Sequence, residues 1–212
     1  MLELDHVLIA ASDLKAAAAA IEERYGLASL EGGRHPGWGT ANRIVPLGDT
    51  YLELVAVVDD TKAGASTFGR WIMAARPRLF RPLGWAVRTD QLDEIAKRLD
   101  LTPESGSRVT RSGETLSWRV AGIEQAANEP SLPFFIEWSS GAAFPGNALA
   151  KHPSGSARVA RLELRGDPNC LAAWLGPHHL RINCAGGSAA VSRIIVHVAA
   201  REIVLEGDSS VA

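Results

Sequence analysis

The sequence predicts an α+β protein built from a repeated unit of one strand, one helix and two or three further strands. The first observation is a short apolar run followed by an aspartate, which occurs three times and ends at Asp13, Asp90 and Asp167. These aspartates are 77 residues apart in both intervals, from 13 to 90 and from 90 to 167. The second observation is that β-branched and aromatic segments follow each site, which is typical of strands. Internal repetition of this kind predicts the architecture before any single element does.

A helix is expected directly after each aspartate, because Asp caps the free N–H groups of a first turn. Apolar residues recur there at steps of three and four, the spacing of one helix face. Gly26 ends the first helix, and Gly176 with Pro177 ends the third. The apolar positions are Leu14, Ala17, Ala18, Ile21 and Tyr25; Leu92, Ile95, Ala96 and Leu99; and Leu171, Trp174 and Leu175.

Strands are expected in the segments that follow each helix. They are TANRIVPLG and TYLELVAVV, then ETLSWRVAG and PFFIEWSS, and finally HHLRINC, RIIVHVAA and REIVLE. Gly, Asp and Asn separate several of them, as expected for turns. The expected division of the chain is a first module at 1–60, a connector at 61–82, a second module at 83–140, a loop at 141–157 and a compressed third unit at 158–212.

The composition is ordinary for a soluble globular protein and argues against several classes of partner. The 212 residues are 46% hydrophobic and 22% charged, with a formal net charge of −2. No basic stripe is present, so no nucleic-acid partner is expected. No apolar run approaches about 18 residues, so no membrane span is expected. The start of the chain, MLELDHVLIAASD, lacks the basic region of a signal peptide, and a cytoplasmic location is therefore expected.

The order of elements resembles that of a known superfamily. A tandem βαβββ unit is the module of the vicinal oxygen chelate superfamily, which includes glyoxalase I, extradiol dioxygenases, and bleomycin- and fosfomycin-resistance proteins. The segments LDHVLIAASDL and GGRHPGWGTANRIVPLGDTYLELVAV resemble its glyoxalase-like branch. The resemblance covers residues 1–140 well and 155–212 poorly. It implies a cupped mixed sheet with helices outside, formed by paired modules.

The resemblance also implies a divalent metal, such as Zn, Ni, Mn or Fe, held on the first and last strands of each module. The matching positions here are His6, Glu53 and Glu137, while the fourth position, in PLGWAVR, has no ligand. A carboxylate among apolar strand residues is costly unless a cation compensates it, which favours a metal. The alternatives are that His6 is a core histidine, and that the two glutamates pair with arginines such as Arg43 or Arg119.

The segment GGRHPGWGTANR is a second candidate site. Its glycines permit close backbone approach to a ligand, while His35, Trp38, Asn42 and Arg43 supply polar groups and an apolar wall. These four residues are expected to bind substrate. The alternative is a turn-rich connection whose polar residues have no role in binding.

Two functions remain open on the sequence. The first, implied by the resemblance, is a metal-dependent lyase or isomerase acting on a small substrate with vicinal oxygens, with Glu53 and Glu137 as catalytic residues. The second is a metal-free protein that sequesters a hydrophobic small molecule, favoured by the missing ligand and six tryptophans. A degenerate interaction protein is a third. A homodimer is a further expectation, because the third unit can close the cup internally or pack against another subunit.

Overall fold

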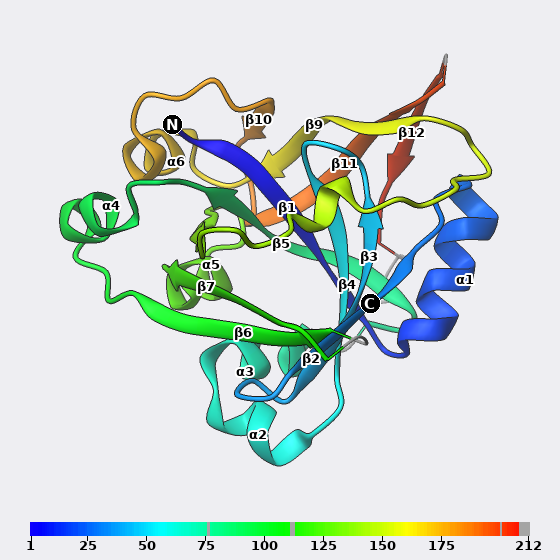
Figure 1. Ribbon diagram of the computed structural model, residues 1–212. Coiled ribbons are helices and arrows are strands. Elements are labelled where there is room, and N and C mark those ends of the chain that lie inside the picture. The colour runs from blue at the N-terminus through cyan, green and yellow to red at the C-terminus, as the bar shows by residue number, and fades with distance from the viewer. Residues whose placement is uncertain (76, 111–112, 200, 208–212) are drawn as a thin grey trace.

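The computed structural model of the protein describes residues 1–75, 77–110, 113–199 and 201–207. The expected connector, second module and third unit therefore include residues that lie outside the described part: 76, then 111–112, then 200 and 208–212. Figure 1 shows the arrangement of the elements.

Eight strands close into a barrel, in the order β1-β4-β3-β2-β6-β7-β8-β5. β1 runs parallel to β4, and β5 runs parallel to β8. The two halves join where β1 pairs antiparallel with β5 and where β2 pairs antiparallel with β6. The first half contains β1 (Glu3–Ala11), α1 (Leu14–Tyr25), β2 (Leu30–His35), β3 (Thr40–Pro46) and β4 (Tyr51–Val57). The second contains β5 (Phe80–Arg88), α4 (Leu92–Leu99), β6 (Glu104–Thr110), β7 (Thr115–Ala121), α5 (Ile123–Asn128) and β8 (Phe134–Trp138).

The barrel wall separates two apolar cores, because successive side chains of a strand point to opposite faces. On β1, Leu8 and Ala10 belong to the inner core, whereas Val7 and Ile9 belong to the outer one. All four side chains are fully buried. A strand buried on both faces reads as a continuous apolar run, which explains the segment HVLIAA.

Two helices that the sequence did not predict lie between the halves, in the expected connector. They are α2 (Asp60–Ala65) and α3 (Thr67–Ala75), and α3 closes the lower end of the barrel in Figure 1. Trp71 of α3 belongs to the inner core and lies against Gly84 of β5. A Cβ at Gly84 would be 2.3 Å from the Trp71 ring, so glycine makes this contact possible.

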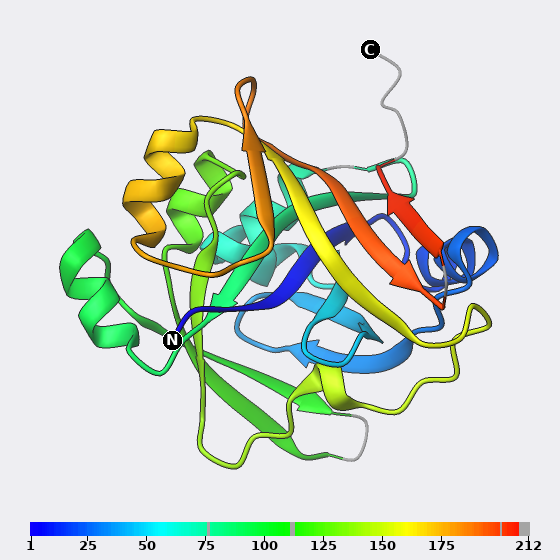
Figure 2. The same ribbon diagram turned by 90° about the horizontal axis from the view of Figure 1, so that it is seen from above.

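The rest of the chain forms a second sheet on the outside of the barrel. After a short 3-10 helix, η1 (Pro145–Asn147), it contains β9 (Ala157–Arg165), α6 (Pro168–Leu175), β10 (Ile182–Ala185), β11 (Ala190–Val198) and β12 (Arg201–Leu205). Its strand order is β10-β9-β11-β12, and β11 contacts β5. Figure 2 shows this sheet lying across the N-terminal strand. The third unit thus packs on the barrel of its own chain, while the homodimer stays a prediction.

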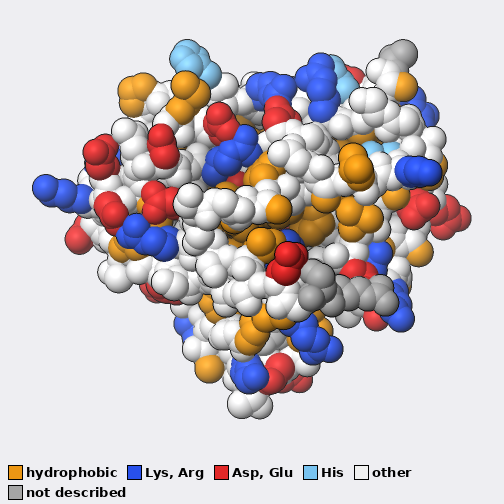
Figure 3. All heavy atoms as spheres, viewed as in Figure 1, with side chains coloured by type: hydrophobic (Ala, Val, Ile, Leu, Met, Phe, Trp, Pro, Cys, Tyr) orange, Lys and Arg blue, Asp and Glu red, His pale blue; other side chains and the backbone are white. Residues whose placement is uncertain are grey.

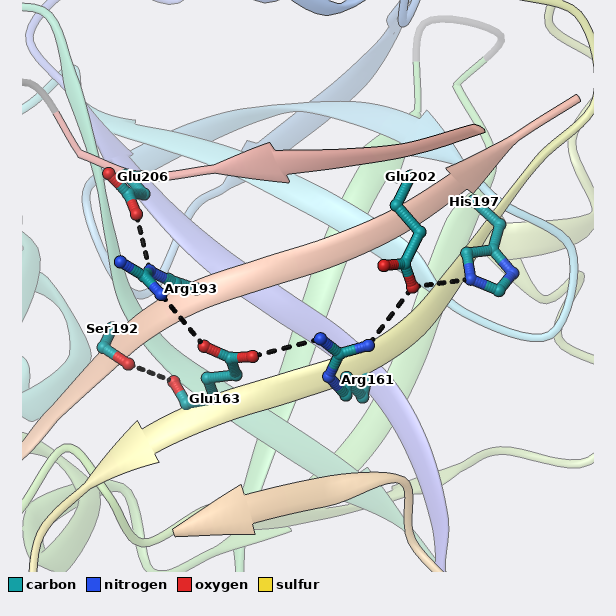
Figure 4. A network of polar contacts seen from close by, with 7 residues as sticks. All are labelled: Arg161, Glu163, Ser192, Arg193, His197, Glu202 and Glu206. Carbon is teal, nitrogen blue, oxygen red and sulfur yellow. Dashed lines mark hydrogen bonds and ion pairs between the residues drawn. The ribbon is translucent and has the colours of Figure 1, made fainter. Parts of the chain in front are cut away.

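The face of the second sheet that points away from the barrel is covered by alternating charges (Figure 4). The Glu163 carboxylate accepts from Arg161 at 3.2 Å and lies 3.6 Å from Arg193. One packed face and one charged face are usual for antiparallel strands such as β9, β11 and β12. The residues of the network are Arg161, Glu163, Ser192, Arg193, His197, Glu202 and Glu206.

Two of the three expected helix caps are confirmed, and one is wrong. Asp13 accepts from the backbone N–H of Ala16, and Asp167 accepts from that of Asn169. The residue that precedes α4 is Gln91, whose side chain makes no capping bond. Asp90 instead binds the N-terminal ammonium at 2.9 Å. None of the described helices is long and apolar enough to cross a membrane.

Candidate active site

A small chamber inside the barrel brings together most of the polar residues singled out in the sequence. Its free volume is about 20 Å³, which is room for one water molecule or ion. Hydrophobic side chains also gather near the middle of the face seen in Figure 3. The chamber is lined by His6, His35, Trp38, Asn42, Tyr51, Glu53, Phe68, Arg108, Trp118, Phe134, Ile136 and Trp138.

Glu53 is the central acidic group of the chamber. It lies on the inner face of β4, where the alternation of the strand also places Val55, and it is 6% exposed. Asn42 donates from Nδ2 to Oε1 of Glu53 over 2.5 Å. The Nε2 atom of His6 is 3.4 Å from Oε2, and that of His35 is 3.7 Å from Oε1. Glu53 is therefore a buried carboxylate with polar neighbours on both oxygens.

His6 is oriented by a buried carboxylate that the sequence reading missed. Its Nδ1 lies 2.6 Å from Oδ1 of Asp5, and Asp5 is fully buried. The partner strand β5 pairs with Leu4 and then with His6, so Asp5 is the extra residue of a β-bulge. A carboxylate only accepts, so Nδ1 carries the proton and Nε2 faces Glu53. Trp138 also donates to Asp5, over 2.8 Å.

His35 lies opposite His6 and is held as a neutral imidazole. Burial lowers the pKa of His35 from 6.5 to about 4, Glu53 opposes this effect, and Arg108 and His6 add to it. Its Nδ1 is 2.8 Å from Oγ1 of Thr40. Because Asn42 Nδ2 lies 3.4 Å from Nε2, that nitrogen is the acceptor and Nδ1 carries the proton.

Asn42 links these groups, and two glycines fix its orientation. The backbone N–H of Gly33 donates to Oδ1 of Asn42 over 2.8 Å, which leaves Nδ2 to donate to Glu53. A Cβ at Gly32 would be 2.0 Å from the same Oδ1. Gly32 thus makes room for Asn42, whereas Gly33 makes room for β6, because a Cβ there would be 2.2 Å from the carbonyl oxygen of Val109. Both glycines lie in β2 instead of a loop.

Aromatic rings enclose the polar groups. The Tyr51 ring stacks on His6 with centroids 4.8 Å apart, and Phe134 contacts His6 edge-on at 5.5 Å. Trp38 and Trp118 contact His35 at 5.6 and 5.9 Å. Burial raises the pKa of Tyr51 well above its usual value, and Asp5 and Glu53 raise it further. A charge inside this enclosure is poorly screened by water.

Two of the expected site residues point away from the chamber. Glu137 shares a strand face with Phe135, which belongs to the outer core, and pairs with Arg119 at 3.0 Å. This is the arginine pairing kept open above for Glu137. Glu137 also lines a separate outer cavity of 480 Å³. Arg43, on the outer face of β3, donates to Ser29 over 3.0 Å. The structure therefore brings together His6, His35, Trp38, Asn42 and Glu53 but neither of these two.

Comparison with models of protein families shows which family the chain belongs to. A model of the glyoxalase-like domain matches residues 4–178. The chain belongs to the glyoxalase-like domain family. This confirms the kinship expected from the sequence, and the curled eight-stranded sheet confirms the expected fold class. No curated protein gives a significant match.

Several solved structures resemble the chain at low sequence identity. A hypothetical protein from Staphylococcus aureus has a TM-score of 0.70 at 14% identity, and the match covers 92% of this chain and 91% of that one. Methylmalonyl-CoA epimerase from Mycobacterium tuberculosis has a TM-score of 0.43 at 17% identity, with 64% and 85% covered. The Streptomyces coelicolor enzyme bound to 2-nitronate-propionyl-CoA has a TM-score of 0.46 at 17% identity, with 68% and 98% covered.

Members of the vicinal oxygen chelate superfamily often use divalent metals, but the donor set of this glyoxalase-like chain does not fit such a centre. Among the described residues of the second half, none that lines the chamber is a His, Cys, Asp or Glu. Within the described ranges, no three His, Cys, Asp or Glu side chains are placed to hold a metal ion. Glu53 already accepts from Asn42. The residues of β5 and β8 at the inner core are Leu83, Gly84, Ala86, Phe134, Ile136 and Trp138.

Sequence reasoning missed several residues of the site. Strict alternation along β1 places Asp5 on the face opposite to His6, because the β-bulge cannot be recognised in the amino-acid sequence. Arg108 lies in β6, a strand that the sequence analysis did not predict. Gly106 of that strand is a usable signal, since a Cβ there would be 2.3 Å from the Trp118 indole and 2.9 Å from that of Trp38.

Proposed function

We propose that the protein is a small-molecule lyase or isomerase that moves a proton at a carbon next to an oxygenated group. The observation that carries the proposal is the buried Glu53 carboxylate, flanked by His6 and His35 inside an aromatic enclosure. Buried ionisable groups that face a shared cavity are costly for folding and are concentrated at catalytic sites.

Glu53 is the proton acceptor in this proposal. The C–H bond next to a substrate carbonyl breaks, its proton goes to a Glu53 oxygen, and its electron pair moves onto the carbonyl oxygen. An isomerase returns the proton to the neighbouring carbon or the other face, whereas a lyase uses the electron pair to expel a leaving group. Neither outcome needs an external oxidant or reductant.

His6 supports the return of the proton. Its Nδ1 is held by Asp5, so its Nε2 remains directed at Glu53. This carboxylate–imidazole–carboxylate order resembles other sites in which a carboxylate fixes the tautomer of a histidine. We assign Asp5 as a positioning residue, and His6 as the group that exchanges a proton with Glu53. Both roles are filled by side chains of the protein itself.

A metal-free binding protein for a hydrophobic small molecule is the second candidate. Its support is the aromatic lining by Trp38, Trp118 and Trp138. Binding an apolar molecule, however, requires none of the buried ionisable side chains, and their desolvation would weaken such a protein without benefit. The ionisable cluster therefore favours the enzyme.

Solvent exchange tests the proposal without knowledge of the final product. The protein is incubated in D₂O with small 2-hydroxy aldehydes, 2-hydroxy ketones and 2-oxo acids, and ¹H NMR follows the C–H signal next to the carbonyl. We expect exchange with the wild type, its loss in Glu53→Gln, and full retention in Glu104→Gln, which removes an exposed carboxylate. Binding of these compounds without exchange would instead support the sequestering protein.

A further inference from the structure

Within the described part of the chain, Arg108 of β6 is a buried cation without a hydrogen-bond partner. The residue is 6% exposed, and its Nε atom has no hydrogen bond. Among residues that the structure describes, no hydrogen bond or ion pair to any atom of Arg108 is formed. Two other buried charged groups, Asp5 and Glu53, differ in this respect, because both accept hydrogen bonds.

An uncompensated buried guanidinium calls for an anion. Guanidinium groups stay charged in proteins, so the cost of burying one is not relieved by loss of a proton. The planar group offers parallel N–H donors that match the two oxygens of a carboxylate. The positive charge of Arg108 acts on a neighbouring residue of the chamber, because it lowers the pKa of His35.

Arg108 also connects the chamber to the surface. It lines the chamber together with Glu53, and it lines an outer depression of 260 Å³ together with Ile44 and Pro145. The remaining lining of this depression is mainly apolar. Its one carboxylate, Glu31, lies 3.9 Å from Arg43. A volume of this size suits only a small ligand.

We propose that Arg108 binds the carboxylate group of the substrate, so that the natural ligand is a small carboxylic acid. The proposal rests on the proposed function, since it assigns the substrate class of the same chamber. Asp5 and Glu53 repel an anion, so the carboxylate stays at Arg108 and the uncharged end of the ligand faces Glu53. Arg108 is thereby the residue that sets both the class of ligand and its direction.

Direct binding tests this assignment independently of turnover. The probes are benzoate and pyruvate, with benzamide and pyruvamide as neutral counterparts and inorganic phosphate as a second anion. Binding is followed by the fluorescence of the chamber tryptophans and by the change in Tm. We expect the two carboxylates to bind and the two amides to fail. Tighter binding of phosphate than of both carboxylates would overturn the choice of ligand.

Variants separate binding from a structural role. Arg108→Met should weaken carboxylate binding by about 10- to 100-fold, the usual range for a lost charged hydrogen bond. Arg108→Lys should retain part of it, because the charge remains while the fork is lost. The control is Arg34→Met, which removes the same charge from an exposed position on the neighbouring strand β2 and should leave binding unchanged.

The stability of the empty protein gives a second readout. Arg108→Met removes an unpartnered buried charge and should raise the Tm without ligand, whereas loss of a structural arginine would lower it. A lowered Tm together with unchanged carboxylate binding would overturn the proposal. Glu53→Gln should still bind carboxylates. Carboxylate binding without solvent exchange would therefore reject the proposed reaction alone. Solvent exchange that depends neither on the charge of the substrate nor on Arg108 would reject this inference alone.

Discussion

Glu53 and Glu137 lie on the last strands of the two barrel halves, but their side chains point to opposite faces of the wall. Glu53 is inside with Val55, and Glu137 is outside with Phe135. We expect Glu53→Gln to abolish solvent exchange and Glu137→Gln to leave it unchanged. Glu137→Gln breaks a partly exposed pair with Arg119, which should cost less than about 1 kcal/mol. Exchange rates and urea unfolding measure the two effects, and an inactive, folded Glu137→Gln protein would contradict this assignment.

Acid should destabilise the protein in part through His35. Its pKa is about 4 in the folded protein and 6.5 without burial, so only the unfolded chain takes up this proton in that interval. The stabilisation is therefore complete above pH 6.5 and is lost as the pH falls towards 4, by about 3 kcal/mol in total. Denaturation curves should show a steeper loss for the wild type than for His35→Gln, which cannot be charged. Parallel pH profiles would refute the argument.

Asp5→Asn should disturb His6 more than it disturbs the fold. The carboxylate accepts from His6 and from Trp138, whereas an amide has one accepting oxygen. One donor then loses its acceptor, at a cost of about 1–3 kcal/mol. We also expect the His6 proton to move to Nε2, which ¹⁵N NMR of the ring detects, together with a fall in the exchange rate. An unaltered tautomer with full activity would remove Asp5 from the mechanism.

The energetic weight of the contact between Gly84 and Trp71 can be tested with a matched pair of glycine variants. Gly84→Ala places a methyl group 2.3 Å from a buried ring, and overpacking of this kind costs about 1–3 kcal/mol. Gly64→Ala adds the same atom to α2, where nothing lies within 4 Å, and should stabilise by about 0.5–1 kcal/mol. Thermal unfolding compares the two, and equal shifts would mean that the contact has no energetic weight.

The sequence predicted local features better than the assembly of the site. Aspartate caps at 13 and 167 are properties of a few adjacent residues. Strict alternation puts Glu53 on the strand face of Tyr51, and both line the chamber. Alternation likewise puts Glu137 on the face of Phe135, but it cannot tell which face is inside when both faces are apolar. The bulge at Asp5 depends on the neighbouring strand. Arg108 lies in a polar strand, ESGSRVT, whose pattern gives no sign that its arginine is buried.

The chamber holds free space for little more than one water molecule, and this sets the kinetics of ligand entry. A larger compound can enter only after aromatic side chains such as Trp38 and Trp138 have moved. Association should then be limited by the opening of the protein, and its observed rate constant should level off as ligand concentration rises instead of increasing without bound. The apparent affinity is reduced in proportion to the fraction of time that the chamber is open. Substitutions that loosen the aromatic packing should speed both the binding and the release of the ligand.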